Sequence, residues 1–96
     1  MKPSLALQAH RAAIRSVVAA HRGRNARVFG SVASGSDTDE SDLDILIDAT
    51  PDMTMFDIGA IRHELRQLLG VPVDVLTPNA LPEKFRASVL ADATPV

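Results

Sequence analysis

The sequence contains no cysteine, tyrosine or tryptophan among its 96 residues, and only three phenylalanines. The absence of cysteine excludes disulfides, a thiol nucleophile and a thiolate metal site. Long apolar runs are also missing, since no segment approaches the roughly 18 consecutive apolar residues that span a bilayer. The apolar stretch 5–9 is broken by His10 and Arg11, so it is not a signal-peptide core. We therefore expect a soluble, cytoplasmic protein without membrane contact.

Two long stretches of the sequence each lack charged residues of one sign. Residues 1–27 contain no acid, and residues 28–61 contain no base, although the formal net charge is only −2. The basic residues of the first stretch are Lys2, Arg11, Arg15, Arg22, Arg24 and Arg27. The acids of the second stretch are Asp37, Asp39, Glu40, Asp42, Asp44, Asp48, Asp52 and Asp57. Hydrophobic content of 46% and this length are typical of one globular domain, which we place at 1–96.

The hydrophobic periodicity predicts a small α/β fold. Helices are expected at 4–22, from Asp52 or Thr54 to Leu69, and at 82–91, with strands at 25–29, 42–47 and 71–76. The turn-forming residues 34–41 predict a loop. This order, α-β-α(turn)-β-α-β-α, indicates a mixed three-stranded sheet with flanking helices. Its first two strands would be antiparallel and its last two parallel.

Several apolar side chains are assigned to the interior by this pattern. Phe56 joins the apolar stripe of the second long helix, and Met53 and Met55 fill the core at its start. Phe85, Val89 and Leu90 are expected to face inward from the last helix.

Asp42 and Asp44 form the first candidate site. Side chains at i and i+2 of a strand project from the same face, so these carboxylates would stand side by side. Two adjacent carboxylates repel, and one of them acquires a raised pKa unless a cation lies between them. Oxygen ligands of this kind suit Mg²⁺. An ordinary acidic surface pair on a strand has the same sequence pattern.

Asp74 is the second candidate, because it lies between Val73 and Val75 in a strand that reads as buried. A buried acid is costly unless it is paired or binds a metal. If the strands 42–47 and 71–76 are neighbours, Asp74 completes an acidic triad. The alternative is an acid at a strand edge that pairs with an arginine.

Gly30 and Ser31 are the third candidate, at the end of the first strand. Backbone N–H groups at such a turn bind phosphate, the serine hydroxyl adds a donor, and glycine allows close approach of a ligand. Two other known motifs, one for binding phosphate and one for binding a metal, do not match the sequence. The spacing from Gly30 to Gly35 fits a P-loop, but the required lysine is missing, and the acids from Asp37 onward lack the glycine of an EF-hand.

The three elements in order resemble the nucleotidyltransferase fold of the DNA polymerase β superfamily. That signature is a hydrophobic residue with Gly-Ser, a spacer, an Asp-x-Asp strand and a third acid on the next strand. The run Gly-Ser-Val-Ala-Ser-Gly, followed by Ser-Asp-Leu-Asp-Ile-Leu-Ile, is similar to the minimal nucleotidyltransferase (MNT) family. This resemblance covers about residues 25–90.

The resemblance implies a role for each matching position. Gly30 and Ser31 would hold the triphosphate of ATP, while Asp42, Asp44 and Asp74 would be catalytic and ligate Mg²⁺, with two ions expected. The sequence departs from the family at Ser34, where an arginine is frequent, and this places catalytic rate in question.

The resemblance also implies an activity and a partner. Family members transfer AMP from ATP to a tyrosine of a HEPN-domain ribonuclease toxin and act as its antitoxin. Because this chain has no tyrosine, the acceptor would belong to that partner, in a hetero-oligomer. No direct nucleic-acid binding is expected. Two alternatives remain open: a binding-only antitoxin that masks the toxin without catalysis, and a transferase acting on a small hydroxylated molecule.

The sequence contains other basic residues that are weaker candidates. The arginines of the first helix form either a solvated face or a surface for phosphate or a partner. Arg62 and Arg66 share a helical face that is either solvated or able to reach phosphate, and Arg27 could help to neutralise the triphosphate. His63 is interpreted as a surface residue.

Overall fold

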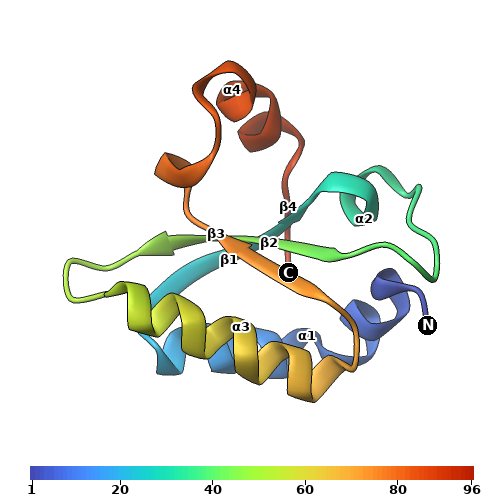
Figure 1. Cartoon of the computed structure of the whole chain (residues 1–96), viewed down its shortest axis with the longest axis horizontal. Coiled ribbons are helices and arrows are strands. Elements are labelled where there is room, and N and C mark those ends of the chain that lie inside the picture. The colour runs from blue at the N-terminus through green and yellow to red at the C-terminus, as the bar shows by residue number, and fades with distance from the viewer.

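A computed structural model describes residues 1–96 as a sheet with two helices on one face and two shorter helices on the other (Figure 1). The helices are α1 (Pro3–Ala20), α2 (Gly30–Ser34), α3 (Met55–Leu69) and α4 (Glu83–Asp92), with a 3₁₀ turn η1 at Pro78–Ala80. The strands are β1 (Gly23–Phe29), β2 (Leu43–Ala49), β3 (Val73–Leu76) and β4 (Thr94–Pro95). They lie in the order β3-β2-β1-β4.

The strand pairing confirms the predicted connections. β1 and β2 are antiparallel, and β2 and β3 are parallel and joined through α3. The sheet has four strands and not the predicted three, because Thr94 and Pro95 form a short edge strand antiparallel to β1. Two residues that include a proline carry no alternation in the sequence, so this strand could not be recognised there.

The main core lies between the sheet and the helices α1 and α3. Alternate residues of β2 and β3 point into it, among them Leu43, Ile45 and Val73, which are fully buried. Ile14 of α1 and Ile61 of α3 meet them from below and are also fully buried. Because side chains alternate along a strand, the residues between them face the opposite side of the sheet.

The opposite side is covered only in part. Leu46 of β2 is fully buried there and Leu81, after η1, is nearly so, although neither belongs to the main core cluster. η1 lies against β2 on this face and α2 lies at its end, whereas α4 stands farther from the sheet and contacts α2 (Figure 1). The acidic residues of β2 and β3 lie beside this partial cover.

The limits of α3 follow from local chemistry that the sequence predicted. Thr54 caps the helix: its hydroxyl accepts the Asp57 amide and the Asp57 carboxylate accepts the Thr54 amide, a reciprocal capping box. Gly70 ends the helix in the left-handed region with φ 68°. Arg22 also donates to the Asp57 carboxylate at 3.1 Å. The Thr54 amide, together with the charge of Arg22, holds the pKa of Asp57 below its ordinary value.

α1 receives its N-terminal cap from a distant residue. Its own N-cap residue, Lys2, makes no side-chain cap. The buried carboxylate of Asp37 accepts the Ser4 amide at 2.9 Å instead. This hydrogen bond lowers the pKa of Asp37. The loop after α2 is thereby attached to the start of the chain.

The basic side of α1 contacts the end of the chain. Arg11 donates to the Pro95 carbonyl at 3.3 Å, and Arg15 donates to the Val96 carbonyl at 3.0 Å. With the ion pair from Arg22 to Asp57, at least three arginines of residues 1–27 have partners within the fold. Neither of the two interpretations given for α1 anticipated this contact.

Several residues assigned to the interior are exposed. Phe56 and Met55 are 89% and 81% exposed at the start of α3. Phe85 is 54% exposed and Leu90 is 39% exposed on α4, a helix without a buried residue. These predictions were wrong because periodicity identifies an apolar face but does not say whether another element covers it, and these four side chains are left uncovered. None of the helices combines the length and apolar character needed to span a membrane.

Candidate functional site

Asp44 and Asp74 are direct neighbours in the sheet. In the parallel pairing of β2 and β3, Asp44 is opposite Asp74, and in the antiparallel pairing with β1 it is opposite Phe29. Both acids face away from the main core, because Leu43, Ile45, Val73 and Val75 occupy the alternating buried positions. β3 is an edge strand, but Asp74 forms no ion pair with an arginine.

The Asp44 carboxyl is strongly perturbed by its surroundings. Burial, with repulsion from Asp74 and from Asp42, raises the pKa of Asp44 to about 6. Asp44 makes no hydrogen bond with another residue that would stabilise its charge. Desolvation and like charges disfavour the ionised form, and a bound cation would relieve both effects.

Gly30 is required by the position of Asp44. It adopts φ 72°, and a Cβ atom at this position would overlap Asp44 Oδ2. The turn after β1 and the Asp44 carboxylate are therefore in direct contact. The sequence predicts that this glycine allows a ligand to approach closely. In the structure it also leaves room for the Asp44 carboxylate.

Ser31 is the second residue of the short helical turn α2. Phe29 is the N-cap of α2 and provides no side-chain cap, and the first amides of a helix have no partner within it. The turn closes through the Ser36 amide, which donates to the Ser31 carbonyl at 2.9 Å. Ser34 donates to the same carbonyl at 3.2 Å, and its hydroxyl lies 2.7 Å from that of Ser36. The serine in place of the family's frequent arginine thus stabilises the turn.

Asp42 lies just before β2 and not within it. It is exposed, and its charge contributes to the raised pKa of Asp44. The preceding loop is fixed by the Thr38 amide, which donates to the Ser41 hydroxyl at 2.9 Å, and by Asp37, which binds Ser4. Asp37 is the residue that sequence reasoning missed. In the sequence, Asp37 is one of several acids in a loop, and nothing nearby distinguishes it from the others.

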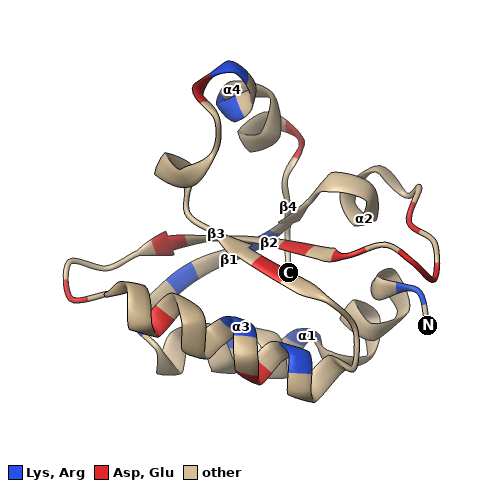
Figure 2. Ribbon diagram, viewed as in Figure 1, with Lys and Arg blue, Asp and Glu red and all other residues tan.

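The donor set of the three aspartates fits a divalent cation, since hard oxygen ligands with mutual repulsion are what Mg²⁺ binds. No three Asp, Glu or His side chains converge closely enough to hold an ion without rearrangement. The strand register places Asp44 directly opposite Asp74, so two of the three acids are neighbours along the sheet. Figure 2 shows the acidic residues along the sheet and the adjoining loop, and basic residues on α1 and α3.

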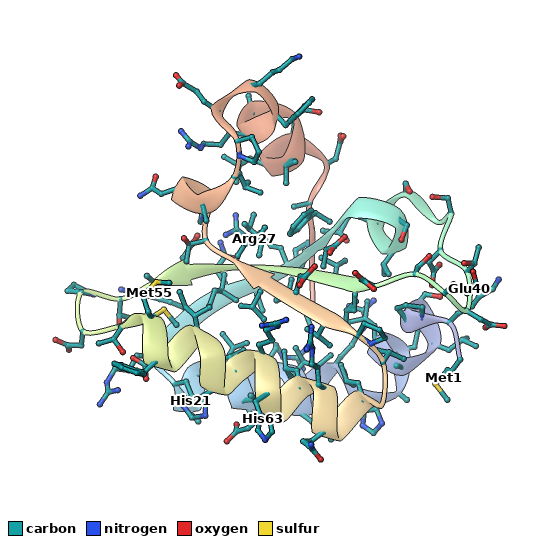
Figure 3. All side chains as sticks on the ribbon, in the orientation of Figure 1. Met1, His21, Arg27, Glu40, Met55 and His63 are labelled. Atoms are coloured by element: carbon teal, nitrogen blue, oxygen red, sulfur yellow. The ribbon has the colours of Figure 1, made fainter.

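The basic residues considered as phosphate ligands lie elsewhere. Arg27, labelled in Figure 3, is opposite Leu46 in the pairing of β1 with β2 and so shares the face of the sheet that carries Asp44. Its guanidinium, however, pairs with Asp48. Arg62, His63 and Arg66 lie on the outer side of α3. The largest hollow, about 360 Å³, is at the edge of β1 beside Val96 and contains none of the predicted site residues.

Comparison with known families and relatives shows which proteins this chain is similar to. Residues 11–96 match the family model described as a nucleotidyltransferase domain. A protein of Methanocaldococcus jannaschii named as a candidate protein adenylyltransferase, MJ0435, is 33% identical over 76 residues, which cover 79% of this chain and 82% of that protein. The protein adenylyltransferase MntA of Thermococcus cleftensis is 29% identical over 82% of this chain and 88% of its own length.

Solved structures share the fold. A structure described as a candidate minimal nucleotidyltransferase superposes with a TM-score of 0.87 and 38% identity, over 97% of this chain and 95% of that one. A toxin–antitoxin structure with AMP-PNP superposes with a TM-score of 0.70 over 83% of this chain and 66% of that one. At 17% identity, the second likeness concerns the fold alone.

Proposed function

Because this chain belongs to the nucleotidyltransferase domain family, and within it to the minimal nucleotidyltransferases, we propose that it transfers AMP from ATP to a hydroxyl of a partner protein. Nucleotidyl transfer is the class of reaction that this family membership gives. The donor, the acceptor and the catalytic residues named below belong to the proposal.

The single observation that carries the proposal is the alignment of Asp44 with Asp74 beside the Gly30 turn. In the reaction, an acceptor hydroxyl attacks the α-phosphorus of ATP, the bond to the β,γ-diphosphate breaks, and pyrophosphate leaves. Gly30 and Ser31 hold the triphosphate through backbone N–H groups and the Ser31 hydroxyl. Asp74, at the strand edge, accepts the proton of the attacking hydroxyl.

Mg²⁺ is the metal that fits these residues, and Asp42, Asp44 and Asp74 would hold it. When bound, Mg²⁺ neutralises the charge on the entering and leaving oxygens of phosphoryl transfer. The raised pKa of Asp44 supports this assignment, because its ionised form lacks a protein cation nearby. Nearly all the work of the protein is then to position charge.

The acceptor is proposed to be a tyrosine of a HEPN-domain toxin, with this chain as the antitoxin. The chain contains no tyrosine, so a tyrosine acceptor must come from another molecule. The relative named MntA, a protein adenylyltransferase, supports a protein acceptor. The toxin–antitoxin assembly of the second solved structure supports a protein partner of this kind.

The test is transfer of labelled AMP to a co-expressed partner, followed by mass spectrometry of that partner. We expect a mass gain of AMP that depends on Mg²⁺ and is lost in Asp44→Asn and in Asp74→Asn. Asp48→Asn is the matched control, because it removes an equal charge from the same face of β2. Transfer that persists in both Asp44→Asn and Asp74→Asn would contradict the proposed site.

A binding-only antitoxin is the second candidate, and the exposure of α4 favours it. α4 has no buried residue and presents Phe85 and Leu90 to solvent beside the partly covered face. Under this alternative, the double variant Asp42→Ala/Asp44→Ala still neutralises the toxin in cells, whereas Phe85→Ser does not. The enzymatic proposal expects the double variant to lose neutralisation.

A further inference from the structure

The outer face of α3 carries a basic hollow that the proposed reaction does not use. Gly59, Arg62, His63 and Arg66 line a hollow of about 140 Å³ whose wall contains no hydrophobic or acidic residue. Their spacing of i, i+3, i+4 and i+7 places them on one side of α3. The buried residues Ile61, Leu65 and Leu69 lie on the other side. Figure 3 shows His63 pointing away from the sheet.

The two arginines of this basic hollow have no acidic partner in the molecule. None of the four ion pairs includes Arg62 or Arg66. Glu64, the nearest acid along the helix, lies 2.9 Å from His21. Arg66 donates through Nε to the Val73 carbonyl at 3.2 Å, which leaves its terminal N–H groups available. Like charges at i and i+4 repel each other, and an anion between them would remove that repulsion.

Gly59 is the second observation that indicates a ligand. It lies inside α3, where glycine is the least favourable residue apart from proline. Its φ is not positive, and a Cβ atom there would meet nothing within 4 Å. The fold therefore has no steric or conformational need for glycine at this position. A missing side chain does allow a ligand to approach the helix backbone closely.

We propose that the basic hollow binds a phosphate group. Guanidinium groups offer paired N–H donors that match phosphate oxygens, and two of them flank the hollow with an imidazole between them. The hollow is small and no hydrophobic residue lines it, so it suits a single anionic group more than a base or an acyl chain. The phosphate is either a free anion or part of a nucleic-acid backbone. Acidic side chains of a protein are a different ligand class and form an outcome of the test.

The experiment is an NMR titration of the full chain in metal-free buffer, followed at the amides of 59–66. Inorganic phosphate, a single-stranded RNA oligonucleotide and a poly-glutamate peptide are added separately. Arg62→Gln is the principal variant, since Arg62 makes no contact that the fold needs. We expect it to weaken phosphate binding about tenfold, as the loss of one charge-assisted donor pair predicts. Arg24→Gln, an exposed arginine outside all ion pairs, is the matched control and should bind unchanged.

Gly59→Leu separates a ligand role from a structural one. Leucine favours the helix, so we expect this variant to melt at a temperature no lower than the wild type, with phosphate binding lost. Arg66→Lys keeps the charge but not the paired donors, and should weaken binding without unfolding the protein.

The three added ligands distinguish a free phosphate from the phosphate of a nucleic-acid backbone and from an acidic protein. Binding of inorganic phosphate without RNA supports a free anion, which agrees with the expectation of no direct nucleic-acid binding. RNA binding whose salt slope falls by about 0.7 units in Arg62→Gln, the value for one lost phosphate contact on a single strand, supports a backbone phosphate. The proposal is overturned if only the acidic peptide binds, if none binds, or if Arg62→Gln and Arg24→Gln behave alike. None of these readouts involves AMP transfer, so this inference and the proposed function can fail separately.

Discussion

Asp44 is the residue on which folding and function make opposite demands. Its carboxyl is partly buried, has no hydrogen-bond donor and faces Asp74 across the parallel strand pair. The ionised form therefore costs folding free energy. As a metal ligand, however, Asp44 must be in that same ionised form. Sites of this kind commonly reduce stability in exchange for activity.

Replacing Asp44 should accordingly make the protein more stable and inactive. A carboxyl pKa raised from 3.8 to about 6 penalises the charged state at pH 7. After allowance for solvent screening, we expect Asp44→Asn to gain about 1 kcal/mol of unfolding free energy at pH 7. Urea denaturation measures this gain, which should shrink at pH 4.5, where wild-type Asp44 is largely protonated.

Asp48→Asn serves as the control for this effect. It removes the same charge from the same face of β2, but it breaks the ion pair with Arg27. Its expected change is a loss of up to about 1 kcal/mol. Equal behaviour of the two variants at pH 7 would refute the electrostatic account of Asp44.

Gly30 and Gly35 differ in what their alanine variants should do. Both have positive φ, 72° and 76°, so alanine costs each about 1 kcal/mol of stability. Only at Gly30 does the added methyl overlap Asp44, whereas Gly35 has open space. We expect Gly30→Ala to lose both stability and AMP transfer, and Gly35→Ala to lose stability alone. Comparable transfer rates in the two variants would contradict the proposed contact.

At the scale of elements, α4 is held mainly by one side chain. Arg86 donates to the carbonyls of Pro78, Asn79 and Leu81, at 2.9, 3.4 and 3.0 Å. These bonds join α4 to η1, while the helix itself buries no residue. Elements with few buried apolar contacts open locally at low free energy.

Hydrogen exchange should detect this difference between helices. We expect the amides of α4 to exchange faster than those of α3, and Arg86→Gln to accelerate exchange in α4 without changing β2. The Arg24→Gln variant gives the background rate for loss of one exposed arginine. Equal protection of α3 and α4 in the wild type would show that α4 is anchored by contacts other than Arg86.

The elements also show how far the sequence could predict the structure. Thr54, Gly70 and the alternation of β2 act locally, and each prediction from them was confirmed. Asp37 caps a helix 33 residues away, a contact that no local pattern encodes. Phe56 and Phe85 were placed inside because hydrophobic periodicity does not say whether another element exists to cover them. The alignment of Asp44 with Asp74 was inferred only on the condition that their strands were neighbours.

For the whole molecule, the shifted carboxyls set an optimum of stability below neutral pH. The pKa values of Asp37 and Asp57 are lowered in the folded state, so their contribution is present above the unfolded value of 3.8 and is lost as pH falls below it. The contribution of Asp44 to stability changes with pH in the opposite direction. Its penalty is complete above about pH 6, decreases as pH falls from 6 toward 3.8, and is absent below that unfolded value.

Together, these two effects predict greatest thermal stability between about pH 4 and pH 5. Melting temperatures measured across pH 3 to 8 at constant ionic strength provide the test. Asp44→Asn should remove the decline between about pH 4 and 6, and leave the decline below pH 4. A wild-type maximum at pH 7 or above would contradict this balance of charges.

The pairing of β2 with β3 has a consequence for the accuracy of folding. A slip of β3 by one residue would turn its side chains over, placing Asp74 in the hydrophobic layer and Val73 and Val75 in the open. Such a misaligned chain would bury a charge and lose part of its core. The hydrophobic residues on one face thus fix the register of β2 and β3, and this register also places the two acids on the other face side by side. Molecules that fold stably therefore have Asp44 opposite Asp74.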